Sequence, residues 1–195
     1  MLKLLFTTVI FTNATYAFEN LNINKNFSAD TAFVGANVLN PNIDIPISNA
    51  TILVSNGNVV KIQPCNRSIP SHYKVVDIQD KWVIPGLIDG HIHLAQSGGA
   101  FTRPDTIDGT KIKPYKEDQQ WLLNNASSIL SGYIKLGITS VFDMGGPSEY
   151  LNHYLGLTPN GIYPDIYAAG TLLAPMDIPS LNINGKTFTK VTSAQ

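Results

Sequence analysis

Residues from about 30 to 84 alternate apolar and polar side chains with the short period of β-strands. The run 32–40 alternates loosely and stops at Pro41, which predicts an edge strand because proline cannot donate to a neighbouring strand. Two β-branched runs, 50–54 and 59–62, flank Asn56-Gly57, a pair that predicts a hairpin with a type I′ turn. Shorter runs at 73–78 and 82–84 complete an all-β module.

A helical pattern appears only in the second half of the chain. The segment 87–94 is apolar at both ends and predicts a strand, and a polar loop rich in glycine and proline follows from about 95 to 115. Apolar residues then recur with the spacing of one helix face, namely Leu122, Ala126, Ile129, Leu130 and Tyr133. Gly137 is placed to end this helix in the left-handed conformation.

Strand and helix continue to alternate after Gly137. The run 138–142 predicts a short buried strand, 148–155 a short helix capped by Ser148, and 165–169 a further strand. Such alternation is typical of βα units and a parallel sheet. The expected fold class is therefore α/β with a leading all-β module.

Composition excludes several function classes. Charged residues make up 14% of the 195 residues, below the roughly 25% of an average chain, and the net charge is −1. Without a run of lysine or arginine, the sequence offers no footprint for nucleic acid. No apolar stretch reaches the roughly 18 residues of a membrane span. One cysteine excludes an intrachain disulfide and a cysteine-based zinc cluster.

The N-terminus resembles a secretory signal peptide over residues 1–17. Lys3 supplies a positive charge, the stretch 4–12 is apolar, and Thr15 and Ala17 are small residues at the −3 and −1 positions of a cleavage site. Cleavage near Ala17 would export the protein to the periplasm or the extracellular space. The alternative is a buried N-terminal strand or an uncleaved tether.

His91 and His93 form the one group of residues with an evident chemistry. Side chains two positions apart on a strand point to the same face, so the two imidazoles are aimed side by side, as in a metal-binding pair. Asp89 lies on the same face and is placed to orient an imidazole by accepting its hydrogen bond. The pair alone is a weak signal, because many such histidines lie at the surface or make ordinary hydrogen bonds.

The surrounding sequence adds a family resemblance. The frame 83–93, Val-Ile-Pro-Gly-Leu-Ile-Asp-Gly-His-Ile-His, closely resembles the metal-dependent amidohydrolase superfamily. The hairpin at 51–62 is similar to the leading strands of that family, and 137–143 is similar to its second barrel strand. The resemblance covers roughly residues 30 to 175 and is specific at 83–93.

The resemblance implies a β-sandwich built from both chain ends, wrapped around a TIM-like (β/α)8 barrel with one or two divalent metal ions. Residues 30–84 would be the first part of the sandwich, and 85–195 a partial barrel of three or so βα units. His91 and His93 match the first-strand ligands, and zinc is the expected ion. The implied activity is that of an exported hydrolase. It would cleave non-peptide carbon–nitrogen bonds of a small molecule, in an amide, a cyclic amide or an amidine, by metal-activated water.

The sequence also departs from the family pattern. The bridging lysine, two further histidines and the aspartate that acts as general acid and base have no matching positions, and we expect them beyond residue 195. The family does not use Asp143 as a ligand, so we expect it to support the site from the loop. The 112 residues from 84 to 195 suffice for three to four βα units at roughly 30 residues each, against about 250 for a closed barrel. A fragment that is inactive alone is the resulting expectation.

Two alternatives stay open on the sequence. One is an exported binding or structural module without catalysis, and the other is an enzyme of the same fold that acts on C–O or C–C bonds. The sequence carries no signal for the substrate, the number of metal ions or the oligomeric state.

Overall fold

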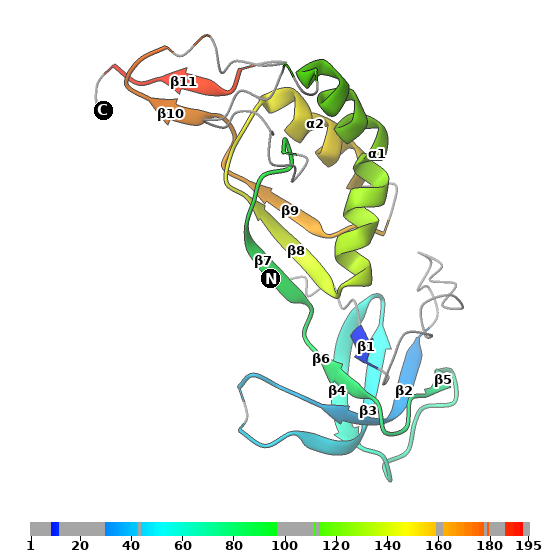
Figure 1. Cartoon of the computed structure of the whole chain (residues 1–195). Helices are drawn as coiled ribbons and strands as arrows, with labels where there is room; N and C mark the ends of the chain where they lie inside the picture. The colour runs from blue at the N-terminus through cyan, green and yellow to red at the C-terminus, as the bar shows by residue number, and fades with distance from the viewer. Residues whose placement is uncertain are drawn as a thin grey trace. The chain divides into compact units, whose positions relative to one another are not determined.

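The computed structural model describes residues 9–11, 30–42, 44–96, 111, 114–158, 162–177, 179 and 186–192. The chain divides into two compact units, Met1–Leu87 and Ile88–Gln195 (Figure 1). The division lies close to Pro85, where the sequence pattern changes from alternating strands to strands and helices.

A six-stranded sheet forms the first unit. Its strands are β1 (Val9–Phe11), β2 (Thr31–Val38), β3 (Ile47–Ser55), β4 (Asn58–Pro64), β5 (Lys74–Asp77) and β6 (Trp82–Ile84). Strand β2 pairs antiparallel with β3 and parallel with both β5 and β6. The prediction of an edge strand is therefore wrong. Pro41 lies beyond the last residue of β2, so its missing N–H removes no bond from the ladder.

The hairpin of β3 and β4 turns at Asn56-Gly57, and Ser55 pairs with Asn58 across the turn. Both turn residues have positive φ, 50° for Asn56 and 72° for Gly57, which confirms the predicted type I′ turn. Side chains from β2, β3 and β6 and from Ile78 form the buried core of this unit: Ala36, Val38, Ala50, Ile52, Ile78 and Val83.

Gly35 explains how β2 changes partner along its length. Residues before it pair with β5, and residues after it pair with β6. Gly35 has a φ of +87°, and a Cβ there would lie 2.9 Å from the Cα of Gln79, in the turn between β5 and β6. Only glycine lets the turn approach β2 this closely.

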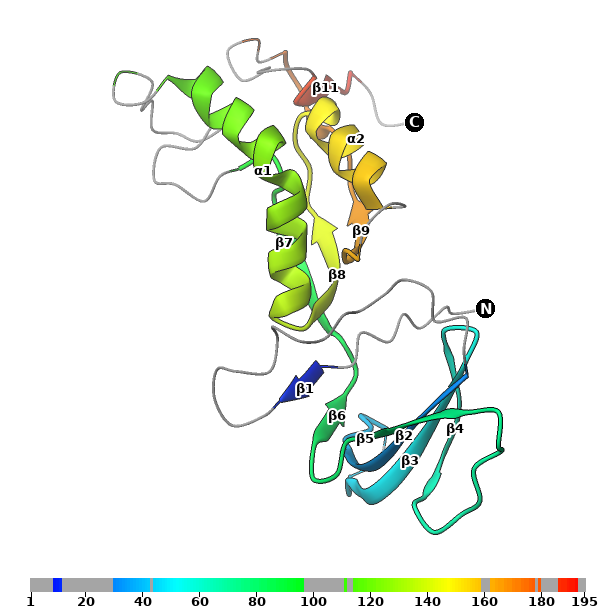
Figure 2. The ribbon, with the colours of Figure 1, turned by 90° about the vertical axis from the view of Figure 1, so that its right-hand side faces the viewer.

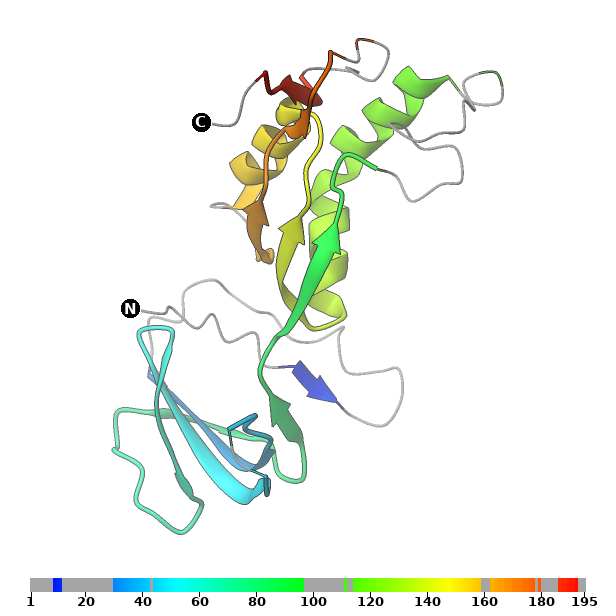
Figure 3. The same ribbon diagram turned by 90° about the vertical axis from the view of Figure 1, so that its left-hand side faces the viewer.

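The second unit holds β7 (Leu87–Ile92), α1 (Tyr115–Lys135), β8 (Ile138–Asp143), α2 (Ser148–Leu157) and β9 (Asp165–Ala168). The three strands form one sheet in the order β7-β8-β9, and β8 runs parallel to β9. Figures 2 and 3 show both helices on the same face of this sheet. A β-sheet module followed by βα units is therefore confirmed. Two short parallel strands, β10 (Leu172–Ala174) and β11 (Phe188–Lys190), follow, and no sequence pattern predicted them.

The predicted stripe of α1 packs on the sheet. Ala126 and Leu130 share a buried cluster with Ile92, Val141 and Tyr154. The helix ends as predicted: Gly137 has a φ of 80°, and its N–H donates to the carbonyl of Ile134 at 2.9 Å.

The expected capping of α2 is wrong. Pro147 occupies the N-cap position with φ −61° and ψ 126°, and Ser148 is already the first helical residue, without a side-chain cap. A capping side chain bonds the free N–H groups from the N-cap position, and here that position is held by the proline before Ser148.

Parts of the predictions fall outside the described residues. Residues 1–8 and 12–29 of the N-terminal segment are among them, and Val9–Phe11 forms β1, which pairs antiparallel with β6. Most of the loop expected at 95–115 also lies outside them. Where the structure describes the chain, no helix is both long and apolar enough to cross a membrane.

Candidate metal centre

His91 and His93 lie at the carboxyl end of β7, where the strand alternation aims both rings to one side. Their ring centroids are 5.4 Å apart and the ring planes meet at 73°. Two imidazoles on one tetrahedral zinc ion, each with a Zn–N distance of 2.0–2.1 Å, have ring centroids about 5 Å apart. The spacing of the two rings therefore fits a shared ion.

A backbone hydrogen bond fixes the His93 ring. Its Nδ1 lies 2.9 Å from the carbonyl oxygen of Gly145. A carbonyl oxygen only accepts, so Nδ1–H is the donor of this bond, and in the neutral ring Nε2 then keeps its lone pair. Metal-binding histidines almost always donate their second ring nitrogen to such an acceptor. His93 is half-buried, whereas His91 is exposed.

Asp89 binds the backbone of its own strand. Its Oδ1 accepts from the backbone N–H of His91 at 3.2 Å. The sequence predicts an acceptor for an imidazole at this position, and the hydrogen bond in the structure goes to the main chain instead. Asp89 thus steadies the strand segment that carries His91.

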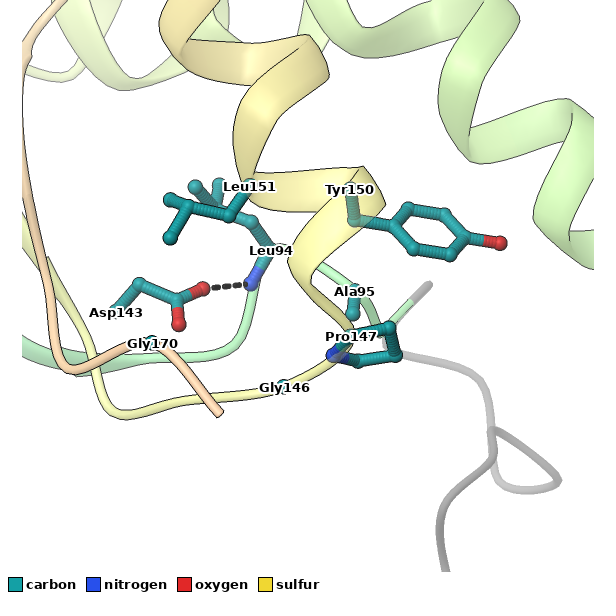
Figure 4. Close-up of a pocket in the computed structure, with 8 residues that line it drawn as sticks. All are labelled: Leu94, Ala95, Asp143, Gly146, Pro147, Tyr150, Leu151 and Gly170. Carbon is teal, nitrogen blue, oxygen red and sulfur yellow. Dashed lines mark hydrogen bonds between the residues drawn. The ribbon is translucent and has the colours of Figure 1, made fainter. Parts of the chain in front are cut away.

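Asp143 lies at the end of β8, buried, with 6% of its surface exposed. Its Oδ2 accepts from the backbone N–H of Leu94 at 2.7 Å (Figure 4), and its Oδ1 accepts from that of Gly145 at 2.8 Å. The N–H of Met144 also donates to the carbonyl of Ile92 at 2.9 Å. The carboxylate therefore ties the end of β7 to the end of β8.

The hollow beside Asp143 is too narrow to hold a water molecule. Side chains and backbone from the strand ends and from α2 line it (Figure 4): Leu94, Ala95, Asp143, Gly146, Pro147, Tyr150, Leu151 and Gly170. As the described residues shape it, this hollow has no room for a substrate.

Two tyrosines on the helices have pKa values raised by burial and by nearby negative charge. Burial, and then the charges of Asp89 and Asp143, raise the pKa of Tyr133. Burial first, and then Tyr133 and Asp143, raise the pKa of Tyr154 to about 12. Both phenols are therefore protonated at neutral pH and unsuited to act as proton acceptors there.

The described residues contain no group of three or more histidine, cysteine, aspartate or glutamate side chains arranged to hold a metal ion. The other two histidines have different contacts. His72 pairs with Asp30 at 3.2 Å in the first unit, and His153 donates from Nε2 to the carbonyl of Leu123 at 3.2 Å. The described residues therefore supply a pair of imidazoles as possible metal ligands, which is fewer than a complete coordination shell needs.

Sequence reasoning missed the backbone groups of this site, the Gly145 carbonyl and the Leu94 N–H. The spacing of Asp143 and Gly145 carried a partial signal, because aspartate side chains often bond the N–H two residues later. Nothing in the sequence indicated that the imidazole of His93 would donate a hydrogen bond to this turn.

No protein-family model matches the chain. An imidazolonepropionase of Pseudoalteromonas atlantica is 30% identical over 115 residues, which cover 48% of this chain and 27% of that protein. A dihydroorotase of Syntrophobacter fumaroxidans is 40% identical over 73 residues, 35% of this chain and 16% of the relative. The chain thus matches about a quarter or less of the length of these relatives.

Solved structures share the fold. A crystal structure of an amidohydrolase aligns with 74% of this chain and 32% of its own, at a TM-score of 0.56 and 20% sequence identity. The aligned part includes the β-sheet module and the βα units that follow it. The chain is a relative of the amidohydrolase superfamily and corresponds to the N-terminal portion of its homologues.

Proposed function

We propose that the chain supplies the first two ligands, His91 and His93, of a divalent-metal centre in an exported hydrolase of non-peptide carbon–nitrogen bonds. The observation that carries the proposal is the paired geometry of the rings. The centroids are 5.4 Å apart, and the Nδ1–H of His93 is engaged by Gly145, so Nε2 is left for an ion. Zinc is the proposed ion, since imidazole nitrogen suits it.

A bound divalent ion would supply a water of lowered pKa and would polarise the carbon under attack. The residues of this chain would hold the ion in place. His91 and His93 present ring nitrogens, Gly145 sets the ring of His93, and the Asp143 carboxylate fixes the two turns around it. Because a catalytic zinc site generally has three protein ligands, we place the remaining ligand and the general acid and base outside the described residues.

The fold and the cellular location belong to the same proposal. The strands β7, β8 and β9 would begin a (β/α)8 barrel, and the sheet of the first unit would form part of a sandwich, as the likeness to amidohydrolase structures supports. Export rests on the signal-like pattern of residues 1–17. The proposed substrates are small amides, cyclic amides or amidines, and assays that include lactones would separate C–N from C–O hydrolysis.

Zinc binding by the purified chain tests the ligand assignment. We expect isothermal titration with Zn²⁺ to detect a site, and His91→Ala and His93→Ala each to weaken it by roughly tenfold or more. His153→Ala is the matched control and should leave the affinity unchanged, because this ring donates to the Leu123 carbonyl in a different part of the unit. Equal zinc affinity in the wild type and in the double His91→Ala, His93→Ala variant would contradict the proposal.

A further inference from the structure

The Asp143 carboxylate uses both oxygens on backbone N–H groups of two separate turns. Oδ2 accepts from Leu94 at 2.7 Å and Oδ1 accepts from Gly145 at 2.8 Å. Bonds of an ionised carboxylate to N–H donors are short and strong, and this one is buried. The side chain is therefore a fixed link between the segments 92–94 and 143–145.

Both hydrogen bonds of the Asp143 carboxylate affect the position of His93. Leu94 directly follows His93 in the chain, so its bond to Asp143 holds the backbone that carries the ring. Gly145 provides the carbonyl to which the His93 Nδ1–H donates at 2.9 Å. One carboxylate thus sets the position of the histidine and the position of the acceptor of its ring.

Gly145 is adapted to this role. Its φ of +114° is open to glycine and rarely to other residues, and a Cβ there would lie 2.8 Å from Cδ2 of Leu172 and 2.9 Å from the Gly170 carbonyl oxygen. The turn that aims the carbonyl at His93 therefore depends on a glycine two residues after the aspartate.

We infer that Asp143 is a positioning residue that locks His93 in the Nδ1–H tautomer, with the Nε2 lone pair presented to a metal ion. The part of the inference that concerns the metal rests on the proposed function. The part that concerns the tautomer rests only on the hydrogen bonds among His93, Gly145 and Asp143.

The tautomer is measured on the metal-free chain. In the wild type, labelled with ¹⁵N-histidine at pH 8, two-bond ¹H–¹⁵N spectra should show a protonated Nδ1 and an unprotonated Nε2 for His93. The His93→Ala spectrum identifies the signal. Free histidine favours the opposite tautomer, so a wild-type His93 protonated on Nε2 overturns the inference without any variant at Asp143.

Asp143→Asn then tests the link itself. The carboxamide keeps the shape, but its NH₂ group faces an N–H donor and cannot accept from it. We expect the Nδ1–H tautomer of His93 to lose its dominance and the Zn²⁺ affinity to fall by about 10- to 100-fold, the usual cost of disturbing a group that orients a ligand. Asp165→Asn, at the start of β9, removes the same charge and should change neither quantity.

A purely structural role gives a different result. If Asp143→Asn lowers stability but leaves the His93 tautomer and the zinc affinity at wild-type values, the inference is wrong. If the wild-type chain shows the expected tautomer but binds no zinc, the proposed metal centre fails while the positioning of His93 stands. Should Asp143→Asn not fold, the wild-type spectrum still decides the tautomer: His93 protonated on Nε2 overturns the inference.

Discussion

Tyr154 places its hydroxyl in the core beneath the three-stranded sheet, fully buried and without a hydrogen-bond partner among the described residues. Burial raises the pKa of this phenol to about 12, against about 10 in the unfolded chain. Because the folded state holds the proton more tightly, the stability linked to Tyr154 is complete below pH 10. It is lost as the pH rises towards 12, by about 2 kcal/mol in the free energy of unfolding. Urea unfolding followed by circular dichroism at pH 8, 10 and 11.5 measures this loss.

Tyr154→Phe is the variant that isolates the effect. It should flatten the alkaline loss of stability, with a residual slope from Tyr133, whose pKa is raised in the same direction. Tyr163→Phe is the control, because the Tyr163 hydroxyl has a partner, the hydroxyl of Ser127 at 2.6 Å. Identical pH profiles for the wild type and Tyr154→Phe would show that the phenol is not the titrating group.

The contacts around His93 mark the limit of sequence reasoning at the scale of single residues. The spacing of His91 and His93 was enough to predict two rings on one face. The hydrogen-bond acceptor of the His93 ring could not be predicted from the sequence. Gly145 lies 52 residues further along the chain, and it contacts the ring only because β7 and β8 pair in the sheet. Asp89 likewise had a clear position on the strand, but the alternation of side chains does not reveal that its Oδ1 accepts from the His91 N–H.

At the scale of elements, α1 offers a matched pair of glycines. Gly137 ends the helix with a φ of 80°, whereas Gly132 lies inside the helix, where an added Cβ meets no atom within 4 Å. Gly137→Ala should lower the free energy of unfolding by about 1 kcal/mol, because a side chain opposes the left-handed conformation. Gly132→Ala should raise it by about 0.5–1 kcal/mol through better helix propensity. Urea unfolding of both variants is the measurement, and a shift of the same sign in both would contradict this account of the helix end.

Elements with a strong local signal were predictable, and elements set by their neighbours were not. The hairpin at Asn56-Gly57 and the buried stripe of α1 follow from turn chemistry and periodicity, which act within a few residues. The interior place of β2 follows from its pairing with β5 and β6, and these strands lie more than 30 residues away. The strands β10 and β11 have three residues each, too few for a period to show.

Across the whole molecule, the second unit presents an aromatic pair on the sheet face that carries no helix. Val141 and Ile166 pack towards the helices, so their neighbours Phe142 and Tyr167 point to the other face. The two rings stack with centroids 4.8 Å apart and planes at 16°. The sequence predicts a short buried strand at 138–142, but Phe142 is 41% exposed, and Tyr167 on β9 is 51% exposed. The prediction of burial is thus wrong for Phe142.

Exposed stacked aromatics favour self-association, because apolar surface left in water gains free energy when it is buried between molecules. The double variant Phe142→Thr, Tyr167→Thr should therefore lower the self-association of the purified chain, measured by static light scattering over a concentration series. Threonine suits a strand, so the fold should persist, with a loss of about 1 kcal/mol in the free energy of unfolding from the broken stack. Val60→Thr, at a residue 55% exposed on β4 of the first unit, removes apolar surface elsewhere and should leave the scattering unchanged. Equal scattering by the wild type and the double variant would mean that this face does not drive association, and a matching decrease in Val60→Thr would assign the effect to apolar surface in general.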